Sequence, residues 1–196
     1  ARSGKSTLAE RRALESGLRV VYVATAQAGD TEMARRIAHH RARRPTGWTC
    51  VEAPLKLAAA LRAHAASDAL LLVDCLTLWL SNLFFAGRAA AQAEAGEALD
   101  CALLAGETDA LVAALPDLPG RILLVSNEVG CGIVPPQPLA RLFADEQGRL
   151  NQRVAAAALQ LAEAKLAKMQ IRAPFSGIIG LRSVSIGDYV KEGADL

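Results

Sequence analysis

The 196-residue chain has little net charge and no run of apolar residues long enough to cross a membrane. Lys and Arg number 22 against 20 Asp and Glu, which leaves a formal charge of +2. Because the charges nearly balance, the net charge says nothing about nucleic acid, and any basic site must be local. No nucleic-acid partner is expected. A membrane-spanning helix needs about 20 consecutive apolar residues. The sequence has no such run and no basic-then-apolar leader, so we expect no membrane span.

Cysteine motifs are also scarce. The four cysteines, Cys50, Cys75, Cys101 and Cys131, are widely scattered, and no C-x-x-C occurs. This spacing suggests neither a zinc site nor a disulfide framework, so we expect a reduced, cytoplasmic compartment. What the chain does have is hydrophobic residues, at 52% of the total, which is enough for one domain of ordinary size.

Three short apolar runs, at 19–26, 69–76 and 121–129, are typical of strands buried on both faces. Helical patterns lie between them, at 5–16, 31–44, 54–66 and 88–114, the last with breaks at Gly96 and Gly106. This alternation predicts an α/β fold with a doubly wound, mainly parallel sheet and helices on both faces. Functional sites in such folds lie at the carboxyl ends of the strands. The polar residues there become candidates: Thr25, Asp74, Asn127 and Glu128.

The chain opens with "ARSGKST", the second half of the phosphate loop G-x-x-x-x-G-K-[ST]. In that loop, backbone amides at a helix start cradle phosphate oxygens, Lys5 reaches the β- and γ-phosphates, and the Ser6 hydroxyl binds Mg²⁺. Asp74 ends an apolar strand and is the expected second Mg²⁺ ligand. A chance match in an exposed turn is the alternative. The phosphate-binding residues are predicted to be Ala1, Arg2, Ser3, Gly4, Lys5 and Ser6.

The first glycine of this loop, and the strand that normally precedes it, would lie before residue 1. We therefore expect a sheet that lacks its first strand and exposes unpaired backbone groups along a hydrophobic edge. Such a chain is expected to bind nucleotide weakly and to be unstable or poorly soluble.

A histidine pair and several arginines stand together in "RIAHHRARRPTGW" at 36–48. Met33, Ile37, His40 and Arg44 are spaced so that they share one face of a helix, while Arg36, His39 and Arg43 share another. This predicts that His40 leans toward the interior and that His39 is more exposed. Two readings stay open from the pattern alone: a buried structural histidine beside a solvated arginine face, or a nucleophile beside phosphate-binding cations.

Four blocks, in order, resemble the bifunctional adenosylcobinamide kinase / adenosylcobinamide-phosphate guanylyltransferase family from residue 1 to about 158. They are "ARSGKS", "VYVATAQAGDTEMARRIAHHRARRPTGWTCVEAP", "LLVDCLTLWLSNLF" and "LLVSNEVGCGIVPPQPLARLFADEQGRLNQRVAAAA". The combination is far more specific than the phosphate loop alone.

The resemblance implies two reactions. Such enzymes transfer the γ-phosphoryl group of GTP or ATP, with Mg²⁺, to the aminopropanol hydroxyl of adenosylcobinamide. They then transfer GMP from GTP to that phosphate through a covalent guanylyl-histidine, which matches His40. Lys5 serves the phosphoryl transfer. The resemblance also implies a homo-oligomer, a trimer, with a corrinoid as the substrate partner.

Further nucleotide contacts come from the same resemblance. They are Ala24, Thr25, Ala26, Arg41, Ala42, Arg43, Arg44, Glu52 and Asp74. Glu52 is expected to contact guanine or ribose, with a plain helix-start carboxylate as the alternative, and Asp74 has a strand-end cap as its alternative.

The sequence changes character after about residue 158. "IRAPFSGIIG" and "GDYVKEGADL" resemble periplasmic adaptor (membrane-fusion) proteins of efflux pumps, where a coiled-coil helix enters a lipoyl-like half-sandwich. We therefore expect a chimeric chain, with an incomplete enzyme domain at 1–158 and a foreign helix plus β-hairpin at 159–196. The alternative function is an adaptor or a biotin or lipoate carrier modified at Lys168. The carrier is disfavoured because Lys168 follows a helical run rather than a hairpin.

Overall fold

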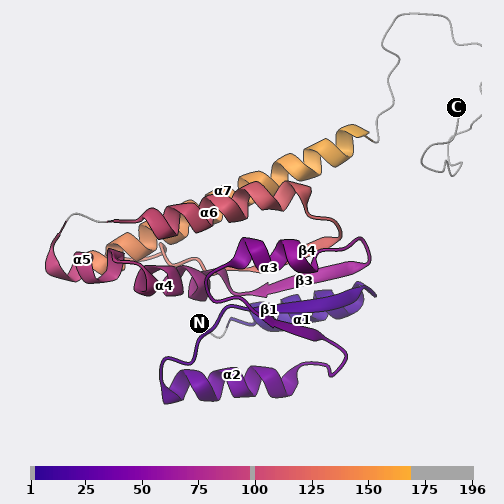
Figure 1. The fold of residues 1–196 in the computed structure, drawn as a ribbon, viewed down its shortest axis with the longest axis horizontal. Coiled ribbons are helices and arrows are strands. Elements are labelled where there is room, and N and C mark those ends of the chain that lie inside the picture. The colour runs from indigo at the N-terminus through magenta and orange to yellow at the C-terminus, as the bar shows by residue number, and fades with distance from the viewer. Residues whose placement is uncertain (1–2, 98–99, 169–196) are drawn as a thin grey trace, which may run out of the picture. The chain divides into compact units, whose positions relative to one another are not determined.

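The computed structural model describes residues 3–97 and 100–168, and the chain up to Ala162 forms one compact unit. Within the described residues, helices and strands alternate along much of the chain (Figure 1). In chain order the elements are α1 (Lys5–Glu15), β1 (Arg19–Ala24), α2 (Thr31–Arg43), β2 (Thr49–Glu52), α3 (Leu57–His64), β3 (Ala69–Asp74), α4 (Leu76–Ala86), α5 (Ala89–Ala95), α6 (Ala102–Ala114), a 3₁₀ turn (Leu115–Asp117), β4 (Arg121–Val125) and α7 (Pro138–Lys168).

The described strands form one sheet in the order β2-β1-β3-β4, and all neighbouring pairs are parallel. The last residues of the strands are in register: Ala24 pairs with Glu52 on one side and with Asp74 on the other, and Asp74 pairs with Val125. All four carboxyl ends therefore meet at one edge of the sheet. The predicted α/β fold with a mainly parallel sheet is confirmed.

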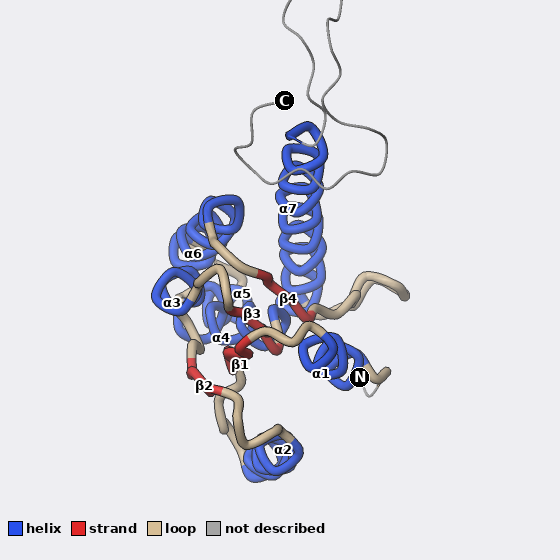
Figure 2. The backbone as a smooth tube through the Cα atoms, turned by 90° about the vertical axis from the view of Figure 1, so that its right-hand side faces the viewer, coloured by secondary structure: helices blue, strands red, loops and turns tan. Residues whose placement is uncertain are grey.

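Helices cover both faces of this sheet, as Figure 2 shows with α1 on one side and α3, α4 and α6 on the other. Because side chains alternate between faces along a strand, Val21 and Leu71 pack into the larger core cluster, while Tyr22 and Leu72 pack into the smaller one. The larger cluster includes residues of α3, α4, α6 and α7, among them Trp79 and Leu150. The smaller cluster contains only one buried residue of α1, Ala13.

Several boundaries differ from the sequence-based prediction. The strands end at Ala24, Asp74 and Val125, earlier than expected. β2 was not predicted, because a four-residue strand on the sheet edge, mostly exposed, carries no apolar run. α4 was not predicted either, since its sequence, LTLWLSNLFFA, is apolar on most sides and shows little helical period. The predicted break at Gly96 is confirmed, where the glycine ends α5 at φ 70°. The predicted break at Gly106 is wrong, because α6 runs through it.

The sheet was expected to lack its first strand and to expose an unpaired hydrophobic edge; in the described residues no such edge lies between β3 and β4. β3 and β4 pair directly, from Leu70 opposite Arg121 to Asp74 opposite Val125, so no unpaired edge separates them. Gly120 makes this close approach possible. It has φ 83°, and a Cβ there would lie 2.2 Å from the carbonyl oxygen of Ala66. Only glycine fits both the backbone conformation and the space.

No helix in the described ranges is both long and apolar enough to cross a membrane. The β-hairpin predicted for the tail falls on residues outside those ranges, whereas the predicted helical run before Lys168 is confirmed as part of α7.

Candidate active site

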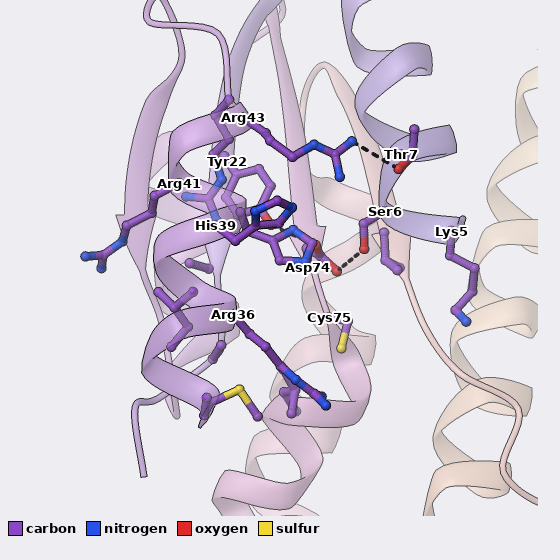
Figure 3. Close-up of a pocket in the computed structure, with 18 of the residues that line it drawn as sticks. Lys5, Ser6, Thr7, Tyr22, Arg36, His39, Arg41, Arg43, Asp74 and Cys75 are labelled. Atoms are coloured by element: carbon purple, nitrogen blue, oxygen red, sulfur yellow. Dashed lines mark hydrogen bonds between the residues drawn. The ribbon is translucent and has the colours of Figure 1, made fainter. Parts of the chain in front are cut away.

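A cleft of about 840 Å³ opens at the carboxyl edge of the sheet, between the start of α1, the strand ends and α2. Its size falls in the range of small-molecule sites. Figure 3 shows Lys5, Ser6 and Thr7 of α1 on one side and Arg36, His39, Arg41 and Arg43 of α2 on the other. The predicted residues that line the cleft are Ser3, Gly4, Lys5, Ser6, Ala24, Ala26, His40, Arg41, Arg43, Arg44, Glu52, Asp74 and Asn127.

The start of α1 is built to receive an anion. Gly4 precedes the helix at φ 80°, a conformation that favours glycine, and no side chain caps the first turn. The first amides of a helix have no partner within the helix and carry its positive dipole end. Lys5 begins the helix, and its Nζ reaches only the Ser3 hydroxyl, at 2.9 Å, within the described residues. The amides and Lys5 can therefore hold phosphate oxygens together.

Asp74 receives two hydroxyl hydrogen bonds at the end of β3. The Ser6 hydroxyl donates to its Oδ1 at 3.2 Å, and the Tyr22 hydroxyl donates to its Oδ2 at 2.7 Å. Burial, reinforced by the nearby Asp74 carboxylate, raises the pKa of Tyr22 above its ordinary value, so the phenol remains a donor. The described residues contain no group of three or more His, Cys, Asp or Glu placed to hold a metal. A hydroxyl beside one carboxylate nevertheless fits Mg²⁺, which binds few protein oxygens and completes its shell with phosphate and water.

Cys75, which follows Asp74, also lines the cleft. Burial raises the pKa of its thiol. Because the thiolate is the reactive form of cysteine, this position is a poor nucleophile, and the histidines of α2 are the better candidates.

Helix α2 presents a half-buried face to the cleft. Asp30 caps its start by accepting from the Met33 amide at 2.7 Å, and none of the helix's residues is fully buried. Met33, Ile37, His40 and Arg44 are half-buried, whereas His39 is exposed. The face predicted from helical spacing is thus confirmed. A half-buried face that meets a cleft rather than a core is the expected property of a binding surface.

The other predicted face of α2, which carries Arg36, His39 and Arg43, also lines the cleft. Arg36 and Arg43 are both exposed. Arg43 reaches the Thr7 hydroxyl of α1 at 3.5 Å, and Arg36 pairs with Glu32 at 2.5 Å. These cations lie across from Lys5 (Figure 3), so negative charge between the two helices is favoured from both sides.

His40 lines the cleft, and one of its ring nitrogens is unpaired within the described residues. Its Nδ1 is buried and has no hydrogen-bond partner within the described part of the chain. The His39 ring lies edge-on to it, with centroids 6.3 Å apart. No described side chain therefore fixes which nitrogen of His40 carries the proton.

Three predicted nucleotide contacts, Arg41, Arg44 and Glu52, already have protein partners. The guanidinium of Arg44 lies 3.5 Å from the centroid of the Tyr22 ring and donates to the Cys50 sulfur at 3.2 Å. Arg41 forms an ion pair with Glu52. Glu52 ends β2, so the alternative of a helix-start carboxylate is wrong. Both arginines line the cleft, but contact with a ligand would compete with these protein partners.

Some predicted residues do not reach the cleft. Thr25 is fully buried, and its hydroxyl donates to the Cys75 carbonyl and accepts from the Cys75 amide, each at 2.8 Å. It therefore ties the ends of β1 and β3 together. Ala42 and Glu128 are outside the cleft lining, and the Glu128 carboxylate accepts from the Gly130 amide at 2.9 Å. Ala1 and Arg2 lie outside the described residues.

Sequence reasoning missed Tyr22 as a site residue. The signal was available in the alternation along "RVVYVATA": Tyr22 is the polar-tipped residue two positions before the end of its strand. It therefore lies on the same sheet face as the strand-end positions Ala24 and Asp74.

A helix start with free backbone amides, a hydroxyl–carboxylate pair and a histidine-bearing helix around one cleft fit a nucleotide-dependent transferase with an α/β phosphate-loop fold. Residues 1–164 match the family of cobinamide kinase / cobinamide phosphate guanyltransferase, and the chain belongs to this family. It is therefore an enzyme of cobalamin biosynthesis that uses a nucleotide substrate.

Three curated relatives carry names that agree with this family. The chain is 56% identical over 155 residues to the bifunctional adenosylcobalamin biosynthesis protein CobP of Pseudomonas aeruginosa, covering 79% of this chain and 83% of the relative. It is 42% identical over 160 residues to the bifunctional adenosylcobalamin biosynthesis proteins CobU of Salmonella typhimurium and Escherichia coli, covering 81% of this chain and 87% of each relative.

The family match continues past the predicted limit at residue 158. No comparison supports the resemblance of the tail to an efflux adaptor, so the adaptor or carrier function is not favoured.

Proposed function

We propose that this chain phosphorylates adenosylcobinamide with GTP or ATP in the presence of Mg²⁺, and then transfers GMP from GTP to the product through His40. The observation that carries the proposal is that one cleft is lined both by the start of α1 and by the face of α2 that bears His40. The enzyme domain extends to about residue 164, where the family match ends, rather than to residue 158. It acts in the cytoplasm and forms a homo-oligomer, a trimer by resemblance to the family.

For phosphoryl transfer, the residues of α1 position the nucleotide. The first-turn amides and Lys5 hold the β- and γ-phosphates, which concentrates positive charge where negative charge builds up during transfer. Ser6 and Asp74, whose side-chain oxygens lie 3.2 Å apart, would hold Mg²⁺. When bound, this ion supplies charge neutralisation for the phosphates. The corrinoid hydroxyl oxygen then bonds to the γ-phosphorus and releases its proton to solvent, the bond from the γ-phosphorus to the β–γ bridging oxygen breaks, and the nucleoside diphosphate leaves.

For guanylyl transfer, a ring nitrogen of His40 attacks the α-phosphorus of GTP. A nitrogen–phosphorus bond forms, the bond to the bridging oxygen breaks, and pyrophosphate leaves. The phosphate of the corrinoid then attacks the same phosphorus, which yields adenosyl-GDP-cobinamide and frees His40. A covalent intermediate divides one difficult displacement into two easier ones. Arg36 and Arg43, on the same side of the cleft, would stabilise the departing negative charge.

The decisive experiment compares His40→Ala with His39→Ala. The proteins are incubated with GTP labelled at the α-phosphate, and acid-labile label on the protein is counted. We expect His40→Ala to lose the covalent label completely while still phosphorylating adenosylcobinamide. His39→Ala should keep most of the label, because His39 is the more exposed of the two histidines and His40, the proposed nucleophile, is left in place. Label that persists on His40→Ala would place the nucleophile elsewhere.

A further inference from the structure

We propose that Tyr22 is a positioning residue that orients the Asp74 carboxylate toward Ser6, so that the two oxygens can hold the Mg²⁺ of the bound nucleotide. The inference rests on the proposed function, because it assumes that Ser6 and Asp74 form the metal site. It adds a residue that holds the ligand without touching the ion.

The hydrogen bond from Tyr22 fixes one end of the carboxylate. Tyr22 is 2% exposed and belongs to β1, whereas Asp74 ends the neighbouring strand β3. Tyr22 pairs in register with Leu72, and Asp74 lies two positions further along β3, where the Tyr22 side chain reaches it. The Tyr22 hydroxyl donates to Oδ2 at 2.7 Å, which leaves Oδ1 directed at the Ser6 hydroxyl.

Tyr22 acts only as a donor here. The phenol O–H donates to a carboxylate oxygen, which has no hydrogen of its own to give. In the described chain, Ser6 and Tyr22 supply the two side-chain hydrogen bonds to Asp74. When the Ser6 hydroxyl turns toward a metal ion, the bond from Tyr22 is the one that still orients the carboxylate.

The Tyr22 ring is itself held in place. The Arg44 guanidinium covers it at 3.5 Å from the centroid, and Trp48 stacks with it, with centroids 6.4 Å apart. A cation over an aromatic face is attracted by the ring's electron density, so Arg44 helps to hold the ring in place. Removing only the hydroxyl, as in Tyr22→Phe, keeps the ring, the stacking and the packing. The substitution therefore isolates the hydrogen bond.

Partners that orient a metal ligand typically contribute about 10–100-fold to metal affinity or activity. We therefore expect Tyr22→Phe to raise the Mg²⁺ concentration needed for half-maximal nucleotide binding by about 10-fold. Nucleotide affinity in EDTA should stay unchanged, because the phosphate-binding amides and Lys5 are intact. A residue that served only packing would shift neither the Mg²⁺ requirement nor the difference between these two conditions.

The test is calorimetric titration of the full chain with GDP, at stepped Mg²⁺ concentrations and in EDTA. GDP is used so that no guanylyl transfer takes place. Ser16→Ala is the matched control, since it also deletes one hydrogen-bonded hydroxyl, which donates to the Ala13 carbonyl at 2.6 Å outside the cleft lining. Its Mg²⁺ requirement should equal that of the unsubstituted chain.

The outcomes separate the two proposals. An unchanged Mg²⁺ requirement in Tyr22→Phe overturns the positioning role, as does an equal loss of affinity with and without Mg²⁺. If the unsubstituted chain binds no GDP, or binds it without any dependence on Mg²⁺, the proposed function fails at its metal site and the inference fails with it. Because Tyr22→Phe keeps the ring and its contacts with Arg44 and Trp48, it should fold, and its urea denaturation midpoint, measured before the titration, checks this.

Discussion

The two faces of the sheet are covered in different ways. On one face, β1 and β3 pack against α3, α4, α6 and α7, and the buried side chains there include Trp79, Leu80 and Phe84. On the other face, the buried cluster is smaller, and α1 contributes only Ala13 to it. The remaining space at the carboxyl edge is the cleft, closed by a helix with no fully buried residue.

This difference separates stability from binding. The face covered by α3, α4, α6 and α7, here the thick face, buries apolar area, which is the dominant favourable contribution to folding. The face covered by α1, here the thin face, keeps polar side chains close to solvent, where a charged ligand can reach them. Substitutions on the two faces should therefore change different measurements.

The largest effect on the free energy of unfolding is expected when a leucine on the thick face is changed to alanine, compared with a leucine of α1 on the other side of the sheet. Leu80 is 1% exposed, and Leu80→Ala should lower the free energy of unfolding by about 2–5 kcal/mol through lost burial and a residual cavity. Leu8, on α1, is 48% exposed, and Leu8→Ala should change it by less than about 0.5 kcal/mol. Urea denaturation measures both. Equal losses would show that the thin face contributes as much stability as the thick one.

A cleft substitution should do the reverse. Lys5→Ala is expected to lower the rate of phosphoryl transfer by about 10² or more, because it removes charge that acts mainly in the transition state. The midpoint of urea denaturation should hardly move, since Lys5 bonds only to Ser3 within the described chain. Lys56→Ala is the control: Lys56 pairs with Glu107 away from the cleft and should keep full activity. Normal turnover in Lys5→Ala would contradict the phosphate-binding role of α1.

The smallest effect is expected at the opposite edge of the sheet, where Arg19 and Asp68 pair at 3.3 Å. The hydrogen bond and charge of Arg19 hold the pKa of the exposed Asp68 carboxyl below its ordinary value. A carboxyl with a lowered pKa in the folded state stabilises the fold above its unfolded pKa, and this contribution disappears as the pH falls through the folded pKa. In Arg19→Ala, the pKa of Asp68 should return toward its usual value, as measured by NMR titration. Turnover in the cleft should not change, and a change would link the two edges.

The elements with a clear period or a buried run could be predicted from sequence. The strands around Val21, Leu71 and Leu123 have continuous apolar runs because both of their faces are covered. The half-buried face of α2 followed from helical spacing, since position on a helix fixes direction whether the neighbour is a core or a cleft. β2 and α4 were not predicted, for opposite reasons: β2 is too short and exposed, and α4 is too uniformly apolar.

The placement of a side chain at the cleft could be predicted where it depends on local sequence, and not where it depends on a neighbouring strand. Lys5, Ser6 and His40 were identified from the phosphate loop, helical spacing and family resemblance. The bond between Tyr22 and Asp74 joins residues that are 52 positions apart, so it follows from strand register and not from any motif. The same holds for Thr25, whose hydroxyl is used by Cys75 across the strand ends.

The stacking of Trp48 on Tyr22 also gives the enzyme an optical signal. The chain contains two tryptophans, and the other, Trp79, is completely buried in the thick core and donates to the Leu55 carbonyl at 2.8 Å. Trp79 fluorescence should therefore report only on unfolding. Trp48 is half-buried and stacks on a ring that the guanidinium of Arg44 covers. A ligand that draws Arg44 away alters the surroundings of this indole, so a chain carrying Trp79→Phe would display cleft occupancy as a change in emission.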